Sequence, residues 1–388
     1  YQAVVARHST SVTMTVNGST RAIGRLFRAV SIAPMIDVTN PHFLQMLRII
    51  SPRYTLYTEM IHANAIINNR HDISRFVGDA NPDTVVQLGG CEPQAMATAA
   101  KIVQDHGFRE VNINVGCPSD RVQHGNFGAV LMKSPHVVAN ILNEMNKKSV
   151  NIPVTIKCRT GVDKFDSLEF LQDFIDAQLC SERPPPHFII HARKCFLQGL
   201  SPKQNRNIPP LDYNRVWKTA QKYPDTIFSI NGGFKTVETI ADALTKVDGC
   251  MIGREVMDNP MFLQQLDRGL FSYCARFSLG KTFEDATVIV VHFQQLTFFS
   301  AYVDDFLTSK PAGSHLPSMA IMMKPLMMLY RSGYGRRFRR ALGEGMTEAR
   351  KSYPHKCHWD LAPVVYKALE QAKIVDIEND QHCKQASM

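Results

Sequence analysis

Residues 226–254 read T-I-F-S-I-N-G-G-F-K-T-V-E-T-I-A-D-A-L-T-K-V-D-G-C-M-I-G-R. Two short apolar runs, Thr226–Ile230 and Gly249–Ile252, enclose a segment with helical periodicity, Val237–Leu244. An apolar run, an amphipathic segment and a second apolar run predict a strand, a helix and a further strand. This stretch therefore predicts one repeat of a β–α fold.

The same alternation extends from Ser31 to about Met261. Amphipathic segments such as Glu92–His106, Ser134–Asn146 and Ser167–Ala177 separate further apolar runs. These runs are Ser31–Ile36, Tyr54–Glu59, Thr84–Leu88, Val111–Val115, Val154–Cys158 and Phe188–His191. Eight β–α units in a chain of 388 residues predict an α/β fold, a (β/α)8 TIM barrel. A doubly wound sheet is the alternative, but its G-x-G-x-x-G motif is absent after the first strand.

Beyond Gln265 the alternation stops, and the sequence predicts a C-terminal all-helical domain. The expected helices are Asp285–Phe298, Ser318–Tyr330, Arg336–Glu344 and Leu361–Ala372. We therefore expect four regions: a basic N-terminal extension (1–30), a catalytic barrel (31–265), a helical domain (266–375) and a disordered tail (376–388).

The residues before Asp37 include no acidic side chain and carry several arginines among serines and threonines. This composition is typical of an organellar transit peptide, but it also fits a disordered tail. The protein is accordingly expected in the cytoplasm, or in a mitochondrion or plastid if the stretch is a targeting signal. Because no run of about 18 apolar residues occurs, no membrane partner is expected.

Composition narrows the class of protein further. The 44 Lys and Arg residues outnumber the 35 Asp and Glu residues, a moderately basic balance that favours polyanionic partners without proving one. The nine cysteines are odd in number and none has C-x-x-C spacing. This argues against a disulfide framework and a structural zinc site, so we expect no metal and a reducing compartment.

Polar or special residues follow almost every expected strand, where the active site of a barrel enzyme lies. Within Asn112–Met132, one strand presents Asn114 and the next turn presents Cys117. A single loop cysteine is usually an inert thiol, but this strand-end position beside an asparagine favours a reactive one. Gly125 and Gly128 suggest a tight loop able to approach a ligand.

Cations follow the next two strands. Lys157 and Arg159 share one face of their strand, and burying both requires an anionic or electron-rich group such as a flavin. His191 ends the following strand and leads into a basic loop, which reads as a site for phosphate or ribose. The basic residues of this loop are Arg193, Lys194, Lys203 and Arg206.

A phosphate site is expected after strands seven and eight. Asn231-Gly232-Gly233 follows the seventh strand and Gly253-Arg254 follows the eighth. Barrel phosphate sites use these two loops, where glycines admit a phosphate close to the backbone and an arginine adds charge.

In the helical domain, a cluster of arginines interleaves with Tyr334 and Phe338. Such a cluster is often only a solvated basic face, but beside a cationic barrel it suits a surface for the backbone of folded RNA. Its members are Arg331, Arg336, Arg337, Arg339 and Arg340.

Several motifs in order resemble the tRNA-dihydrouridine synthases, in particular the bacterial branch that modifies D-loop positions 20 and 20a. They are Ala33-Pro34-Met35, Val86–Gly90, Asn112–Ser119, Ile156–Gly161, His191–Lys194, Asn231–Gly233 and Met251–Glu255, with the loop Gly199–Leu211. Two departures stand out. Val130 replaces a second cysteine of the family's loop, and Met323-Lys324 stands where an Arg-His pair is expected.

The resemblance implies an FMN-binding barrel and a helical domain that grips tRNA, with NADPH as electron donor. Cys117 would protonate C5 of uracil while hydride passes from flavin N5 to C6. The residues implied to hold FMN are Pro34, Met35, Gln87, Lys157, His191, Asn231, Gly232, Gly233, Gly253 and Arg254. Those implied to place the uridine and its tRNA are Asn114, Arg159, Arg193, Lys194, Lys203 and Arg206.

Two alternatives stay open at this point. Another FMN barrel, of the dihydroorotate dehydrogenase or ene-reductase type, would share the cofactor site but would not need the basic helical domain. A non-catalytic tRNA-binding protein would have no reason to keep Cys117, Lys157 and the phosphate turn together. We expect a monomer.

Overall fold

The computed structural model describes residues 13–16, 19–22, 29–278, 299, 301–303, 305–307, 317–329, 332–352 and 361–372. The expected helix at 285–298, Arg331 and the C-terminal tail lie outside these residues, as does most of the N-terminal extension. Within that extension, β1 (Thr13–Val16) and β2 (Ser19–Ala22) pair as an antiparallel hairpin.

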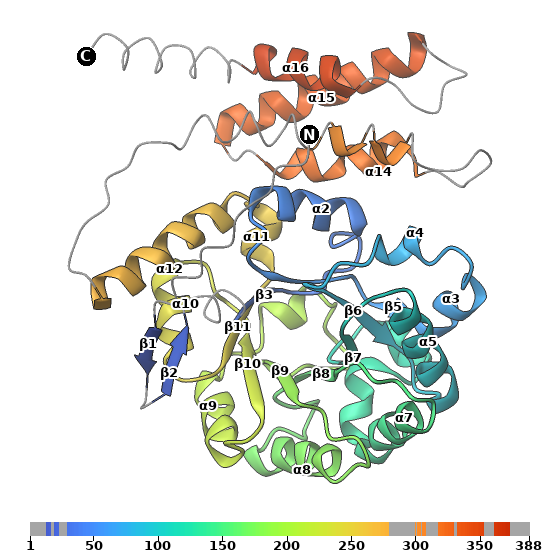
Figure 1. Cartoon of the computed structure of the whole chain (residues 1–388), viewed down its shortest axis with the longest axis vertical. Helices are drawn as coiled ribbons and strands as arrows, with labels where there is room; N and C mark the ends of the chain where they lie inside the picture. Colours follow the sequence, from blue (N-terminus) through green and yellow to red (C-terminus); the bar gives the residue numbers. More distant parts are fainter. Residues whose placement is uncertain are drawn as a thin grey trace. The chain divides into compact units, whose positions relative to one another are not determined.

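The central feature is a closed barrel of eight parallel strands, which confirms the predicted TIM barrel (Figure 1). Its strands are β3 (Val30–Ile32), β4 (Thr55–Tyr57), β6 (Thr84–Gly89), β7 (Val111–Val115), β8 (Val154–Arg159), β9 (His187–His191), β10 (Ile227–Asn231) and β11 (Gly249–Ile252). The pairs β4–β6 and β11–β3 close the ring. The two-residue strand β5 (Ile61–His62) pairs only with the end of β6.

Helices between the strands cover the outside of the barrel (Figure 1). They are α3 (Ala63–Asn68), α4 (Ser74–Val77), α5 (Pro93–Asp105), α7 (Pro135–Lys147), α8 (Leu168–Leu179), α9 (Tyr213–Lys222) and α10 (Val237–Leu244). The short helix α6 (Asp120–His124) lies within the connection from β7 to α7. Local chemistry sets where the helices begin. Ser167, Asp212 and Thr236 cap the amides of α8, α9 and α10.

Strand periodicity divides the side chains between the two faces of the barrel wall. On β7, Val111, Ile113 and Val115 alternate with Asn112 and Asn114. Side chains from strands on opposite sides of the ring meet in one buried cluster, which therefore lies inside it: Ala33, Tyr57, Val85, Ile189 and Met251. The interior thus mixes this small apolar cluster with amide and charged groups.

The chain forms two compact units that are discontinuous in sequence. The second comprises residues 40–52, 254–267 and 283–388, so α2 (Pro41–Ile50) and α11 (Arg254–Asp258) group with it rather than with the barrel strands. Within this unit α2 contacts the 3₁₀ helix η3 (Lys324–Met328), and His42 Nδ1 lies 3.0 Å from the Tyr302 hydroxyl. The predicted boundary at residue 265 stays a prediction.

The helices of the second unit differ in length from those expected. The predicted helix at 318–330 is α14 (Met319–Met323) followed by η3, because Pro325 supplies no amide hydrogen to continue the α-helical pattern. The next helix, α15, runs from Ser332 to Ser352 and packs against α16 (Leu361–Gln371) (Figure 1). The helix α12 (Phe262–Ser278) spans the boundary between the units. No described helix is long and apolar enough to cross a membrane.

Candidate active site

The carboxyl ends of neighbouring strands bring the predicted polar residues to one end of the barrel. Asn114 on β7 is paired in register with Lys157 on β8, and His191 on β9 is paired with Asn231 on β10. Gln87 lies one strand before Asn114, and its side-chain Oε1 accepts a hydrogen bond of 2.8 Å from Asn114 Nδ2. The structure therefore gathers these five residues as the sequence predicted.

Asn114 holds the loop that carries Cys117. Its Oδ1 accepts hydrogen bonds from the amides of Gly116 at 3.1 Å and of Cys117 at 3.0 Å. The Cys117 carbonyl accepts from the amide of Ala129 at 2.9 Å. Its thiol is half-buried and lies 3.5 Å from the Ser119 hydroxyl. Asn114 is therefore a positioning group for the cysteine loop.

Gly128 allows the return of the chain against this loop. Its φ is +71°, and a Cβ there would lie 2.5 Å from the Cys117 carbonyl oxygen. Only glycine fits both the left-handed backbone and the close approach. The 3₁₀ helix η1 (Gly128–Lys133) begins at this point and supports the Cys117 loop.

Lys157 supplies a cation at the barrel mouth. Burial, together with the charge of Arg159, lowers the pKa of Lys157 to about 8. Its Nζ donates to Asn231 Oδ1 at 3.0 Å, and Asn231 Nδ2 donates to the Met251 carbonyl at 2.8 Å. Lys157 is thus oriented by a neutral amide rather than neutralised by a carboxylate, which leaves its positive charge for an anionic ligand.

The turn after β10 contains two consecutive glycines with positive φ. Gly232 and Gly233 have φ values of +121° and +80°, and Tyr213 donates to the Gly232 carbonyl at 2.6 Å. A Cβ on Gly232 would lie 2.8 Å from His191 Cδ2. At Gly253 the nearest side-chain atoms, Ala33 Cβ and Met35 Sδ, are at 3.5 and 3.7 Å. Arg254, which begins α11, belongs to the second unit.

Arg159 lies on the same face of β8 as Lys157, and its guanidinium binds the loops at this end of the barrel. Its side chain is buried and donates to three backbone carbonyls: Gly116 at 3.0 Å, Lys194 at 3.2 Å and Asn205 at 3.0 Å. The Gly116 carbonyl lies on the loop after β7, and the carbonyls of Lys194 and Asn205 lie on the loop after β9, so Arg159 joins these two loops. The two-residue spacing predicted that Arg159 and Lys157 lie on one face of β8. It did not predict which carbonyls accept hydrogen bonds from Arg159.

The other basic residues of this region divide into two groups. Arg193 donates to the carbonyls of Pro209 and Asn207, and Lys194 forms an ion pair of 2.9 Å with Asp166. Lys203 and Arg206 are exposed on the same loop. The first pair therefore stabilises the loop, and the second pair lies at its surface.

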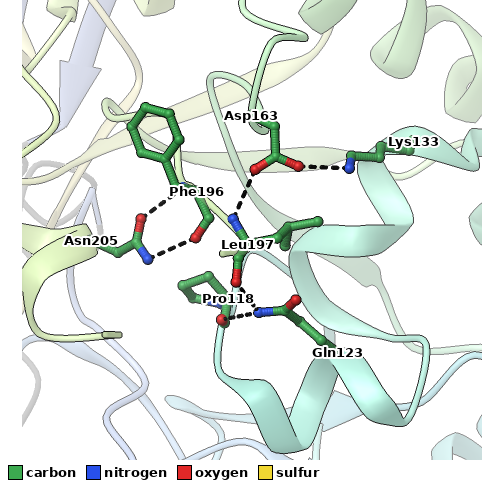
Figure 2. A network of polar contacts seen from close by, with 7 residues as sticks. All are labelled: Pro118, Gln123, Lys133, Asp163, Phe196, Leu197 and Asn205. Carbon is green, nitrogen blue, oxygen red and sulfur yellow. Dashed lines mark hydrogen bonds and ion pairs between the residues drawn. The ribbon is translucent and has the colours of Figure 1, made fainter. Parts of the chain in front are cut away.

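A polar network, which the sequence analysis missed, fixes the loops around the cysteine (Figure 2). Gln123 Nε2 donates to the carbonyls of Pro118 at 2.8 Å and Leu197 at 2.7 Å, so one side chain bridges two loops. Asp163 accepts from the Leu197 amide at 2.8 Å and pairs with Lys133 at 2.7 Å. The fully buried Asn205 bonds both the amide and the carbonyl of Phe196. No local pattern distinguishes these residues from surface polar ones.

The described members of the arginine cluster lie on α15. Arg336, Arg337 and Arg340 are exposed, and Arg340 pairs with Glu344 at 2.8 Å. Phe338 is fully buried, so it belongs to the core of this unit and not to the basic face. Among the described residues, no group of three His, Cys, Asp or Glu side chains is placed to hold a metal ion.

Comparisons with known proteins show the family of the chain. A family model described as dihydrouridine synthase (Dus) matches residues 31–301. The tRNA-dihydrouridine(20/20a) synthase of Shewanella oneidensis is 48% identical over 248 residues, 63% of this chain and 72% of that protein. The same enzyme of Haemophilus ducreyi is 49% identical over 242 residues, with 62% and 73% covered. That of Escherichia coli K12 is 46% identical over 241 residues, with 62% and 69% covered.

Among solved structures, nitroalkane oxidase from Streptomyces ansochromogenes matches with a TM-score of 0.37 and 11% identity, over 60% of this chain and 66% of that one. This likeness is too low to inform function. The family match covers most of the chain and includes the strand ends that form the site. The resemblance seen in the sequence is confirmed: the chain belongs to the dihydrouridine synthase family, whose members are oxidoreductases.

Proposed function

We propose that this protein reduces the C5=C6 bond of a uridine at position 20 or 20a in the D-loop of tRNA, with FMN as cofactor and NADPH as electron donor. One observation carries the proposal: adjacent strands place the Cys117 loop and the Lys157 cation at the same barrel mouth. An acid and a cation at one mouth suit the reduction of an electron-poor double bond, since a proton and negative charge must both be accommodated.

The residues at the mouth fit FMN. Lys157, with a lowered pKa and a neutral amide partner, suits the pyrimidine edge of a flavin, where reduction adds negative charge. The left-handed Gly232-Gly233 turn suits the phosphate. We assign FMN binding to Pro34, Met35, Gln87, Lys157, His191, Asn231, Gly232, Gly233, Gly253 and Arg254. Bound FMN would supply the hydride for C6 of the uracil.

The protein's own residues then act on the proton and on the substrate. The Cys117 thiol donates the proton to C5, and Asn114 keeps the thiol at the mouth through the loop amides. The target base must leave its stack to reach the barrel. Arg193, Lys194, Lys203 and Arg206 form the loop that receives it, and Arg159 contributes by holding this loop to the cysteine loop.

The exposed arginines of α15 would bind the tRNA backbone, since guanidinium groups pair well with phosphate. Arg336, Arg337 and Arg340 are exposed members of this face, the half-buried Arg339 lies beside them on α15, and Arg331 is assigned to the face from the sequence. The compartment follows that of the tRNA substrate, whether cytoplasmic or organellar. We propose that the enzyme acts as a monomer.

The test measures flavin content, the response of NADPH oxidation to tRNA, and the effect of removing the proposed acid, Cys117. Purified protein should show a flavin spectrum, and unmodified tRNA should stimulate NADPH oxidation and gain dihydrouridine. Cys117→Ala should lower dihydrouridine formation by about 10²-fold or more, the usual size of general-acid catalysis, while NADPH still reduces the flavin.

Two results would redirect the assignment. A yellow protein whose NADPH oxidation is indifferent to tRNA would indicate a small-molecule FMN reductase. A protein that binds tRNA but cannot be loaded with FMN would indicate a binding protein without catalysis.

A further inference from the structure

The hydrogen bonds of Asn114 continue downward through the barrel to its opposite end. Gln87 Nε2 donates to Asn112 Oδ1 at 2.7 Å, and Asn112 Nδ2 donates to Thr155 Oγ1 at 3.0 Å. Thr155 Oγ1 donates to Glu110 Oε1 at 2.8 Å. We call these five residues the amide relay: Asn114, Gln87, Asn112, Thr155 and Glu110. It connects the cysteine loop to a carboxyl group that precedes β7, at the far end of the strand.

The donor and the acceptor of every hydrogen bond in the amide relay are set at its upper end, where Asn114 binds the cysteine loop. The backbone amides of Gly116 and Cys117 can only donate, so Asn114 must turn its oxygen toward them and its NH₂ toward Gln87. Gln87 must then accept with its oxygen and donate onward, and Asn112 must do the same. Each side chain therefore has one allowed orientation as long as its lower neighbour accepts.

Glu110 accepts the last hydrogen bond of the amide relay. The Thr155 hydroxyl has one hydrogen, and since its oxygen accepts from Asn112, that hydrogen must reach an acceptor. Glu110 Oε1 is its nearer acceptor at 2.8 Å and lies 3.5 Å from the Tyr57 hydroxyl, and the Val111 carbonyl is a longer second acceptor at 3.4 Å. Burial raises the pKa of Glu110 to about 7, with Thr155 and Tyr57 opposing the rise. A protonated carboxyl still accepts through its other oxygen, so the relay keeps its direction in both forms.

Resting on the proposed role of Cys117, we propose that Thr155 and Glu110 are positioning residues for the catalytic cysteine, which they orient through the amide relay. Without an acceptor below it, the NH₂ of Asn112 stays unpaired unless Asn112, Gln87 and Asn114 turn over together, so a cost at the lower end competes with the hydrogen bonds at the upper end. Asn114 turned over would set its NH₂ against two backbone amides that need an acceptor. The Cys117 loop would then lose its two anchoring hydrogen bonds.

The test compares variants that break the amide relay with variants that preserve it. Thr155→Val keeps the shape of the side chain and removes the hydroxyl, and Glu110→Leu removes the acceptor. Thr155→Ser and Glu110→Gln restore a hydroxyl and an acceptor oxygen. Ser229→Ala is the matched control, because Ser229 is a buried hydroxyl of the opposite wall that pairs with His187 instead.

The first readout is independent of catalysis. Each variant is treated with iodoacetamide, and alkylation of Cys117 is compared by mass spectrometry with that of the exposed Cys180 in the same molecule. In Thr155→Val we expect the ratio to rise about fivefold, the factor that loss of one hydrogen bond gives to a local equilibrium. In Glu110→Leu we expect a smaller rise, because the Val111 carbonyl can still accept from Thr155. Thr155→Ser, Glu110→Gln and Ser229→Ala should match the wild type.

The second readout separates the two halves of the reaction. At saturating FMN, which removes any effect of Gln87 on FMN affinity, NADPH should reduce the flavin of the relay variants at the wild-type rate, whereas kcat for tRNA should fall by up to about fivefold with little change in KM. Lower thermal stability with unchanged Cys117 alkylation and unchanged kcat would overturn the proposal and leave the amide relay a structural element. If the wild type formed no dihydrouridine, the proposed function would fail, while the alkylation ratios would still decide the positioning role.

Discussion

At the scale of single residues, Lys157 gives the site its dependence on pH. Its pKa of about 8 means that the ammonium is charged below that pH and loses its charge above it. The affinity of the apoprotein for FMN should therefore weaken by up to about tenfold per pH unit above pH 8, as the cation is titrated. Fluorescence titration of FMN across this range measures it. Lys157→Met should bind FMN weakly at every pH, and a variant that kept the full dependence would contradict the assignment.

Gly232 contributes to the proposed FMN site through its backbone, whereas Lys157 contributes through its side chain. Gly232→Ala would place a methyl group 2.8 Å from His191 Cδ2 at a φ of +121°, so the turn must deform. We expect the purified variant to retain little FMN while its fold persists, as measured by flavin absorbance and circular dichroism. Gly343→Ala is the control, because a Cβ there meets nothing within 4 Å in the middle of α15. That substitution should stabilise the protein by about 0.5–1 kcal/mol and leave FMN content unchanged.

At the scale of elements, the sequence predicted the strands well and the loops poorly. Strands β7 and β11 have the expected bounds, because a buried parallel strand is marked by its own apolar run. Lys157 and Arg159 were placed correctly on one face of β8. The partners of Arg159 are carbonyls of loops distant in sequence, and no periodicity encodes which backbone oxygens fold toward it.

The hydrogen bonds of Arg159 to three carbonyls predict a specific loss of stability. Arg159→Met would leave the carbonyls of Gly116, Lys194 and Asn205 without this donor in a buried place. We expect the free energy of unfolding to fall by about 3 kcal/mol, measured by urea denaturation, because unsatisfied buried acceptors are costly. Lys222→Met, which removes an exposed cation paired with Asp176, should change it far less, because exposed ion pairs contribute little to stability. Equal effects would show that Arg159 is not a structural link.

The helical elements show a similar limit of sequence reasoning. Phe338 lies among arginines in the sequence, yet it is fully buried while Arg336 and Arg337 are exposed. Helical periodicity of α15 explains this alternation only once the packing partner, α16, is known. The basic residues were predictable as a cluster, and the face that they share was not.

At the scale of the whole molecule, the excess of positive charge should govern how tRNA binds. The double variant Arg336→Gln, Arg337→Gln should weaken tRNA binding. It should also reduce the magnitude of the slope of log affinity against log salt concentration by about 2, because each arginine removed leaves one phosphate with its counterion. Filter binding at several salt concentrations measures both. Lys367→Gln, on α16 and paired with Glu348, is the matched control and should leave the slope unchanged. An unchanged slope in the double variant would remove α15 from the tRNA surface.

The discontinuous second unit has a consequence for how the chain is made. α2 leaves the ribosome early, with its buried face of Phe43, Leu47 and Ile50, but its neighbour η3 follows about 270 residues later. At a synthesis rate of about 5–20 residues per second, η3 is synthesised roughly 15–55 seconds after α2, and the apolar face of α2 lacks this neighbour until then. Nascent chains arrested between the two should therefore hold a chaperone at α2, and release should coincide with the emergence of η3.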